Sequence, residues 1–428
     1  MKPIIFKFGG ASVKDAAGIR NVASIISKHG HHSGLVIVVS AMGKTTNALE
    51  QMLKLALEKA EFSAEWQALK TMHYETAMQL FHTDEKQKQV LQALNGYFEE
   101  LAEILRSATS AESDFIYDQA VSIGEYLSSF LLSSFLQSTG LPVFLLDASK
   151  FIRTNDNWRE GEVDMDGSTL LVQKQISPLL KDGFVLTQGF LGGTADGLRT
   201  TLGREGSDYT AALLAYFLDA DSVSIWKDVP GVLSADPKWM PDAVLLPELS
   251  YQDAAELTYY GATVIHPKTI RPLAWKKIPL FVCSFLNPDA KGTLVGPELK
   301  KHRQESRIRK TGQVLVSLSS RDFSFMEESN IREVLQAFSD AGLKMQMLQV
   351  SATSISVVTD GEERRLEKAL YKISSKYLVL FNRNLTLVTI HNPVDSDHSR
   401  LLESKKPILV QQTRSTLQVL FPEDQELQ

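Results

Sequence analysis

The stretch Ile4-Ile5-Phe6-Lys7-Phe8-Gly9-Gly10 is an apolar, β-prone run that ends at two glycines. A helix is predicted next, over residues 15–28, and the continuous apolar run Gly34-Leu35-Val36-Ile37-Val38-Val39 follows it. Short, wholly apolar runs separated by a helix are typical of parallel strands that are buried on both faces of a sheet. The N-terminal part of the chain is therefore predicted to be an α/β fold with a mostly parallel sheet.

Further along the chain, four apolar runs with helical patterns between them are predicted strands of the same sheet: 142–146, 183–187, 222–225 and 279–282. The segment from about 47 to 118 differs, because it is rich in Ala, Leu, Glu, Gln and Lys, lacks Pro and has Gly96 as its one glycine. Such a composition favours helices. We expect two to four helices here, inserted on the sheet scaffold.

The C-terminal part has a different rhythm after a charged stretch that follows Pro297. Its predicted order, β-α-β-β-α-β, is that of a ferredoxin-like unit. Three later strand patterns, at 385–390, 408–411 and 416–421, indicate an incomplete second copy. The expected domains are a catalytic domain, a linker, a first ferredoxin-like domain and a short second one, over 1–297, 298–311, 312–383 and 384–428.

Composition excludes several classes of function. The 428 residues include 45 Lys and Arg against 51 Asp and Glu, a net charge of −6, which argues against a binder of nucleic acid or of anionic membranes. The single cysteine, Cys283, excludes an intrachain disulfide and a thiolate zinc site. No run of about 18 apolar residues and no secretory signal is present, so a cytoplasmic protein is expected.

Two strand ends carry candidate chemistry. At Lys7-Phe8-Gly9-Gly10 the glycines let backbone N–H groups approach an anion, and the lysine supplies charge for a phosphoryl group; a plain βα turn is the alternative. The loop Ser40–Asn47 contains Gly43-Lys44-Thr45, but Val38 stands where a P-loop needs glycine. This loop is then either a ligand-binding loop at a strand end or a capped helix start.

Three further stretches are candidates. Glu125 lies in a helix pattern and could hold an ammonium group or simply be solvated. The loop Gly197–Thr210 has two arginines, several hydroxyls and Asp208 before an apolar helix, a combination suited to anions. The stretch Ile225–Lys238 has two Pro-containing turns that could contact a nucleotide.

Taken together and in this order, these motifs resemble those of aspartokinases, in the amino-acid kinase superfamily. The resemblance rests on KFGG-x-S-V, SA-x-x-x-x-TN, S-x-GE, RTTLGR-x-GSDYTAALLA, DVPGV and, at 261–267, G-A-x-V-I-H-P. It implies an αβα sandwich with a C-terminal ferredoxin-like ACT regulatory region. It also implies transfer of the ATP γ-phosphoryl group, with Mg²⁺, to the β-carboxylate of L-aspartate, the entry step to lysine, threonine and methionine.

The resemblance also implies residue roles. Lys7 and Asp208 are the expected catalytic residues, with Lys7 neutralising charge on the phosphoryl group and Asp208 orienting nearby lysines. Glu125 is expected to hold the aspartate ammonium group and Arg199 a carboxylate. The other expected substrate-binding residues are Ser40, Thr46, Thr200 and Ser207. The expected ATP-binding residues are Lys7, Phe8, Gly9, Gly10, Lys227, Asp228, Leu233, Lys238, Thr263 and Val264.

The sequence departs from the family pattern at several positions. Ala11 replaces a hydroxyl residue, Lys238 an arginine, and Thr263 a lysine near the nucleotide phosphates. In the tail, Gln346 and the segment Val350-Ser351-Ala352 replace the carboxylates of the usual lysine site, so weak or absent lysine feedback is expected. A homodimer through the ACT region is also implied. The alternatives are a non-catalytic amino-acid sensor and a kinase for another acidic amino acid.

Overall fold

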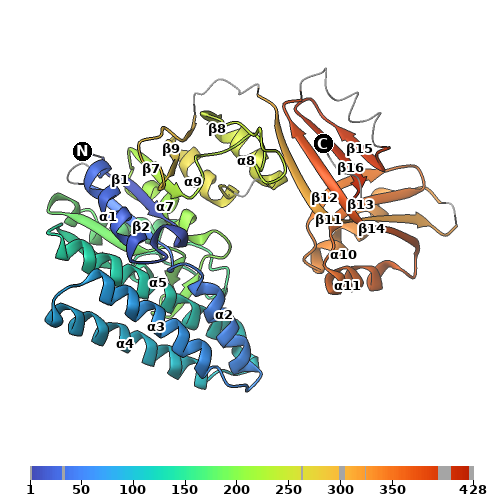
Figure 1. The fold of residues 1–428 in the computed structure, drawn as a ribbon. Coiled ribbons are helices and arrows are strands. Elements are labelled where there is room, and N and C mark those ends of the chain that lie inside the picture. Colours follow the sequence, from blue (N-terminus) through green and yellow to red (C-terminus); the bar gives the residue numbers. More distant parts are fainter. Residues whose placement is uncertain are drawn as a thin grey trace. The chain divides into compact units, whose positions relative to one another are not determined.

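The computed structural model describes residues 2–30, 34–261, 264–297, 304–322, 324–393 and 406–423. The chain divides into two compact units (Figure 1). The first unit comprises Met1–Val232, Leu245–Ala255 and Thr263–His302, and the second comprises Leu233–Val244, Glu256–Ala262 and Arg303–Gln428. Two short segments from the middle of the sequence therefore belong to the C-terminal unit.

The first unit is built on an eight-stranded sheet in the order β3-β4-β2-β1-β7-β9-β10-β8. All neighbours are parallel except β9 and β10, which are antiparallel. The strands are β1 Ile4–Phe8, β2 Leu35–Val39, β3 Val143–Leu146, β4 Phe184–Gln188, β7 Ser222–Lys227, β8 Glu248–Ser250, β9 Leu280–Ser284 and β10 Thr293–Gly296. The predicted mostly parallel sheet is confirmed, and so are all six predicted strands of this region.

Helices surround this sheet, and a separate two-stranded hairpin pairs β5 Leu191–Gly193 with β6 Arg199–Thr201. The helices are α1 Ala16–His29, α2 Thr45–Leu57, α3 Ser63–Leu80, α4 Asp84–Arg106, α5 Ser113–Ser138, α6 Met165–Gln175, α7 Gly206–Phe217, α8 Tyr251–Tyr260 and α9 Pro267–Lys276. Helices α2, α3 and α4 fill the predicted helical segment, whose expected end at 118 falls inside α5. Figure 1 shows α3 and α4 side by side beyond α5, far from the sheet.

Local sequence explains the α1 boundaries. The carboxylate of Asp15 accepts a hydrogen bond of 2.8 Å from the Gly18 N–H, which caps the helix start. Ile19, Val22 and Ile26 recur at helical spacing and are fully or almost fully buried. Every residue of β2 is buried, as expected for a central strand covered on both faces.

The second unit carries a six-stranded antiparallel sheet in the order β12-β13-β11-β14-β16-β15. Its elements follow one another as β11 Ser306–Ser320, α10 Glu328–Asp340, β12 Met345–Val350, β13 Ser354–Asp360, α11 Glu363–Ile373, β14 Tyr377–His391, β15 Leu409–Gln412 and β16 Thr416–Pro422. The first six form the predicted β-α-β-β-α-β order. Residues from β11, β13 and both helices share one core, which includes Val316, Phe338 and Leu366.

Two long strands join the ferredoxin-like unit to the strands that follow it. In β11, residues 313–319 pair with β13 and with the start of β14, whereas residues 306–310 pair with residues 387–391 at the end of β14. The register shifts between Lys310 and Gln313, where Gly312 has a φ of +65°. Strand β11 thus begins inside the expected linker, and β14 runs through the expected boundary at 383. Residues 298–303 of that linker lie outside the described residues.

No helix in the described part of the chain combines the length and apolar character that a membrane crossing requires.

Candidate active site

The carboxyl ends of the central parallel strands bring several candidate residues to one edge of the sheet. Phe8 lies opposite Val39 of β2 and opposite Trp226 of β7, so the residues that follow these three positions emerge together. Open parallel sheets bind ligands at this edge. The expected phosphate loop after β1, the loop after β2 and Lys227 therefore converge, although they are distant in sequence.

At this edge one carboxylate holds two lysines. Asp208 Oδ1 lies 2.6 Å from Lys7 Nζ, and Asp208 Oδ2 lies 3.0 Å from Lys227 Nζ. The Asp208 side chain is fully buried, while the Lys7 and Lys227 side chains are 7% and 17% exposed. Burial alone would raise the pKa of Asp208, but the two ammonium groups outweigh it and lower that pKa below its usual value. This cluster carries one surplus positive charge and suits an anionic ligand.

Helix α7 explains how Asp208 reaches the lysines. Glu205, just before the helix, has a φ of +56°, and Asp208 lies in the first turn, where the helix dipole favours negative charge. Gly189 permits the close approach of this helix start, since a Cβ there would lie 2.5 Å from Ser207 Cβ. Ser207 is itself buried next to Asp208 at the helix N-terminus.

Glu125 lies on α5 close to this cluster. Burial raises the pKa of Glu125 to about 8, against the opposing effects of a hydrogen bond from the Ala41 backbone and of the Lys7 charge. Its Oε2 atom is buried and has no hydrogen-bond partner among the described residues. Gly124 lets α5 approach, because a Cβ there would lie 3.0 Å from both Leu49 Cδ1 and Thr45 Cγ2. A buried acceptor without a partner is suited to a ligand cation such as an ammonium group.

The turn after β1 and the loop after β2 pack closely. A Cβ on Gly10 would lie 2.6 Å from the Ala41 carbonyl oxygen, and a Cβ on Gly9 would lie 3.6 Å from Lys7 Nζ. Helix α2 starts at Thr45 without a side-chain cap, so the alternative of a capped helix start is wrong here. Ser40, directly after β2, and Thr46, in the first turn of α2, are both half-buried.

Arg199 and Thr200, expected at the substrate, have protein partners. The Arg199 Nη1 atom lies 2.8 Å from Glu100 Oε1 of α4, in the wall of a cavity of about 590 Å³. The Thr200 hydroxyl is buried and lies 2.6 Å from the Thr154 hydroxyl. No interaction recorded among the described residues links either side chain to Lys7 or Asp208.

Asp118 was missed by the sequence analysis. Its fully buried carboxylate accepts hydrogen bonds from the Arg159 N–H, at 3.0 and 3.1 Å, and from the Thr201 N–H and hydroxyl, at 3.1 and 2.7 Å. Burial raises its pKa to about 6 in spite of these bonds. Asp118 thereby fastens β6 to α5. The available signal was its position seven residues before Glu125, on the same side of one helix.

The other expected ATP-binding residues are divided between the two units. Asp228 is exposed and Val264 is half-buried in the first unit, whereas Leu233 and Lys238 belong to the second unit. Thr263 lies outside the described residues. Lys268 is close to the loop Gly197–Thr210, because a Cβ on Gly203 would lie 3.5 Å from Lys268 Nζ.

The described residues contain no group of three or more His, Cys, Asp or Glu side chains that could hold a metal ion.

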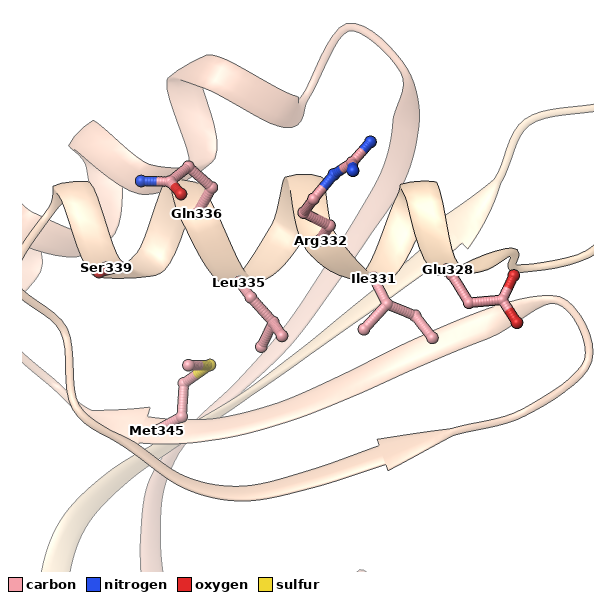
Figure 2. Close-up of a pocket in the computed structure, with 7 residues that line it drawn as sticks. All are labelled: Glu328, Ile331, Arg332, Leu335, Gln336, Ser339 and Met345. Atoms are coloured by element: carbon pink, nitrogen blue, oxygen red, sulfur yellow. The ribbon is translucent and has the colours of Figure 1, made fainter.

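A separate pocket of about 500 Å³ lies in the second unit, between α10 and β12 (Figure 2). Ile331, Leu335 and Met345 form its apolar wall, and Figure 2 shows Arg332 and Gln336 extending from the opposite side of α10. Glu328 lies at the start of the same helix. The charged residues of its lining, Glu328 and Arg332, are both exposed.

Comparison with known proteins agrees with this geometry. The model of the Amino acid kinase family matches residues 2–284. Lysine-sensitive aspartokinase 3 of Escherichia coli (strain K12) is 30% identical over 395 residues, covering 90% of this chain and 86% of that protein.

Solved structures agree with this match. Escherichia coli aspartokinase III in complex with lysine and aspartate has a TM-score of 0.83 and 28% identity, covering 100% of this chain and 97% of that chain. The same enzyme in complex with aspartate and ADP has a TM-score of 0.82 and 29% identity, covering 99% and 97%. With this fold, this sequence match and the lysine–aspartate cluster at the sheet edge, the chain belongs to the aspartokinases of the amino acid kinase family.

Proposed function

We propose that this chain transfers the γ-phosphoryl group of ATP to the β-carboxylate of L-aspartate, producing 4-phospho-L-aspartate and ADP. The observation that carries the proposal is the buried cluster of Lys7, Asp208 and Lys227, with Glu125 beside it, in a chain of the aspartokinase family. A β-carboxylate oxygen attacks the γ-phosphorus, and the bond to the β,γ-bridging oxygen breaks. Both electrons of that bond stay with ADP.

Phosphoryl transfer depends chiefly on positioning and on charge neutralisation. Lys7 and Lys227 are two ammonium groups fixed by one carboxylate, and their surplus charge is available to the phosphoryl oxygens. Because Asp208 holds both lysines before the nucleotide arrives, little reorganisation is needed in the transition state. In this proposal the backbone N–H groups of Gly9 and Gly10, which follow Lys7 without side chains, bind phosphate oxygens.

For aspartate, Glu125 is the proposed partner of the ammonium group, since its Oε2 atom is buried and has no hydrogen-bond partner in the described residues. Ser40, Thr46 and Ser207 lie at the same edge and contribute polar groups. We also propose that Arg199 binds a carboxylate of the substrate, which then replaces the Glu100 carboxylate as the partner of Arg199.

We propose that Mg²⁺ enters with ATP, bound through the phosphate oxygens. The described residues supply no cluster of three ligating side chains of their own, and Mg²⁺ typically keeps several waters and binds through substrate phosphates. Asp228 directly follows Lys227 at the end of β7, and its carboxylate is exposed. It is the carboxylate that we propose to contact the metal. The metal would neutralise phosphate charge alongside the lysines.

The proposed role is the first step towards lysine, threonine and methionine in the cytoplasm, with weak lysine feedback. Gln346 Oε1 accepts a hydrogen bond of 2.8 Å from Lys310 Nζ, so the chain's own ammonium group already contacts this neutral amide. A free lysine would find no carboxylate at this residue. We also propose a homodimer through an ACT-type C-terminal region, whose edge strand β12 exposes Val350.

A coupled ADP-release assay with ATP, Mg²⁺ and L-aspartate tests the activity, with L-glutamate as the alternative acceptor and Lys7→Ala as the inactive control. We expect aspartate-dependent turnover that Lys7→Ala abolishes. Release of ADP with glutamate alone would instead support another acidic acceptor. ATP binding by calorimetry without any turnover would support a sensor.

Lysine titration in the same assay tests the feedback proposal. We expect less than two-fold inhibition by lysine at about 1 mM. The reason is that the lysine ammonium group would be buried without a carboxylate partner and would therefore bind weakly. Strong inhibition below that concentration would contradict the proposal.

A further inference from the structure

Arg199 lines the cavity of about 590 Å³ in the first unit, where α4, α5, the end of β3 and the hairpin of β5 and β6 meet. Four charged side chains line this cavity, two acidic and two basic: Glu100, Asp147, Lys150 and Arg199. Their formal charges cancel. The net formal charge of the cavity lining is therefore zero, and the Arg199 guanidinium in particular is already paired with a carboxylate in the arrangement observed.

The two acidic residues differ in how firmly they are held. Asp147 Oδ1 accepts hydrogen bonds from the Tyr126 hydroxyl and from the N–H and hydroxyl of Ser149, at 2.8, 3.0 and 2.8 Å. Among the described residues, the Glu100 carboxylate makes one ion pair, with Arg199, and its side chain is 43% exposed. Glu100 is thus the more easily displaced partner, because moving its carboxylate into water breaks a single ion pair.

Arg199 is held independently of Glu100. Its side chain is 16% exposed, its Nε donates to Gln119 Oε1 at 3.4 Å, and its guanidinium lies 5.6 Å from the centre of the Tyr126 ring. The Gln119 amide also donates a hydrogen bond of 2.8 Å to the Arg199 carbonyl oxygen. The guanidinium therefore stays in position when Glu100 leaves, and its remaining donors can then bind another carboxylate.

We propose that Glu100 competes with a carboxylate of the acidic substrate for Arg199, and so sets the affinity of the enzyme for that substrate. The inference rests on the proposed function, in which Arg199 receives a substrate carboxylate. Glu100 is a positioning residue, since it acts through Arg199 and touches no reacting atom. Substrate binding requires exchange of one carboxylate for another, which leaves the charge of the cavity unchanged and lowers the observed affinity.

The competition predicts a change in KM without a change in kcat. Glu100→Gln removes the competing charge and should lower the KM for aspartate about three- to five-fold, the range expected for a partly exposed ion pair. Its kcat should stay within about two-fold, because the transition state is reached after Glu100 has left. Glu103→Gln is the matched control, since Glu103 is an exposed acid one turn further along α4 and its KM should not change.

A double-mutant cycle establishes that Glu100 acts through Arg199. In an Arg199→Met background, Glu100→Gln should leave the KM unchanged; Arg199→Gln provides a second background if the first does not fold. An unchanged or raised KM in Glu100→Gln alone would overturn the proposal. The same fall in KM without Arg199, or in Glu103→Gln, would also overturn it, since either result means a general effect of negative charge.

The experiment separates this inference from the proposed function. If the unmodified enzyme releases no ADP with aspartate, the proposed function fails. The dissociation constants of aspartate and of glutamate, measured by calorimetry on the same variants, are then compared in place of the KM. Tighter binding of either acid to Glu100→Gln, dependent on Arg199, would still support the competition. Absence of acid binding by every variant would overturn it.

Discussion

Replacing Glu125 by glutamine should make the protein more stable, and increasingly so as the pH rises. Burial raises the pKa of this carboxyl from its ordinary value of 4.5 to about 8. The folded protein therefore binds the proton more tightly than the unfolded chain does. By linkage, the free energy of unfolding falls as the pH rises from 4.5 to 8, because the folded state must ionise a buried group. Glutamine has nearly the same size and cannot ionise.

The size of the effect follows from the two pKa values. At 1.36 kcal/mol per pH unit, the raised pKa lowers the free energy of unfolding by about 1 kcal/mol at pH 5 and by about 4 kcal/mol at pH 8. The advantage of Glu125→Gln over the unmodified protein should therefore grow by about 3 kcal/mol between these pH values. Packing differences between the two side chains do not depend on pH, so they cancel from this change.

Urea unfolding of the two proteins at pH 5 and at pH 8 measures the change. Glu103→Gln, an exposed substitution of the same type, should show no such growth. A stability difference that is the same at both pH values would refute the reasoning, because it would mean that Glu125 is ionised at no cost in the folded state. The variant should also lose aspartate binding, since the amide cannot pair with an ammonium group.

Two further substitutions test the site, and a matched pair of glycine substitutions tests the packing of α5. Asp208→Asn leaves the ammonium groups of Lys7 and Lys227 without their carboxylate, so the rate of ADP release should fall by about 100-fold or more. A fall of less than about ten-fold would contradict the proposal that Asp208 positions these two lysines for catalysis. Lys227→Met should lower kcat by about 10- to 100-fold and leave the KM for aspartate unchanged; steady-state kinetics in which only that KM moves would assign Lys227 to the acceptor instead. Gly124→Ala should destabilise the protein by about 1–3 kcal/mol because its Cβ meets packed side chains, whereas Gly96→Ala, in open space on α4, should stabilise it by about 0.5–1 kcal/mol; thermal melts in which both change in the same direction would contradict this packing.

The sequence was sufficient to predict the sheet and to single out Lys7 and Asp208, which are in contact at its carboxyl edge. Wholly apolar runs such as β2 are buried on both faces, and Lys7 and Asp208 follow from motifs that occur in a fixed order along the chain. The resemblance implied that Asp208 orients nearby lysines, and the structure shows that Lys7 and Lys227 are in contact with it. Nothing in the spacing shows that Asp208 contacts Lys227 as well as Lys7.

The contacts that the sequence analysis did not foresee have the same origin. The pairing of Arg199 with Glu100 joins a hairpin to a helix 99 residues earlier in the chain, and the contact between Thr200 and Thr154 joins strand β6 to a segment 46 residues earlier. Asp118 was missed because a lone aspartate in a helix pattern is usually solvated, and its hydrogen-bond donors come from residues 41 and 83 positions later. Side-chain contacts of this kind are set by tertiary packing rather than by local pattern.

The pairing of β11 with β14 has a consequence for the modular history of the C-terminal sheet. The segment 313–382 begins and ends at neighbouring positions of this sheet, since Gln313 lies opposite Leu385. The residues that flank the segment in sequence, 306–310 before it and 387–391 after it, pair with each other. The β-α-β-β-α-β unit is thus inserted between two strand segments that pair with each other. Truncation after 383 would therefore leave residues 306–310 without their neighbouring strand.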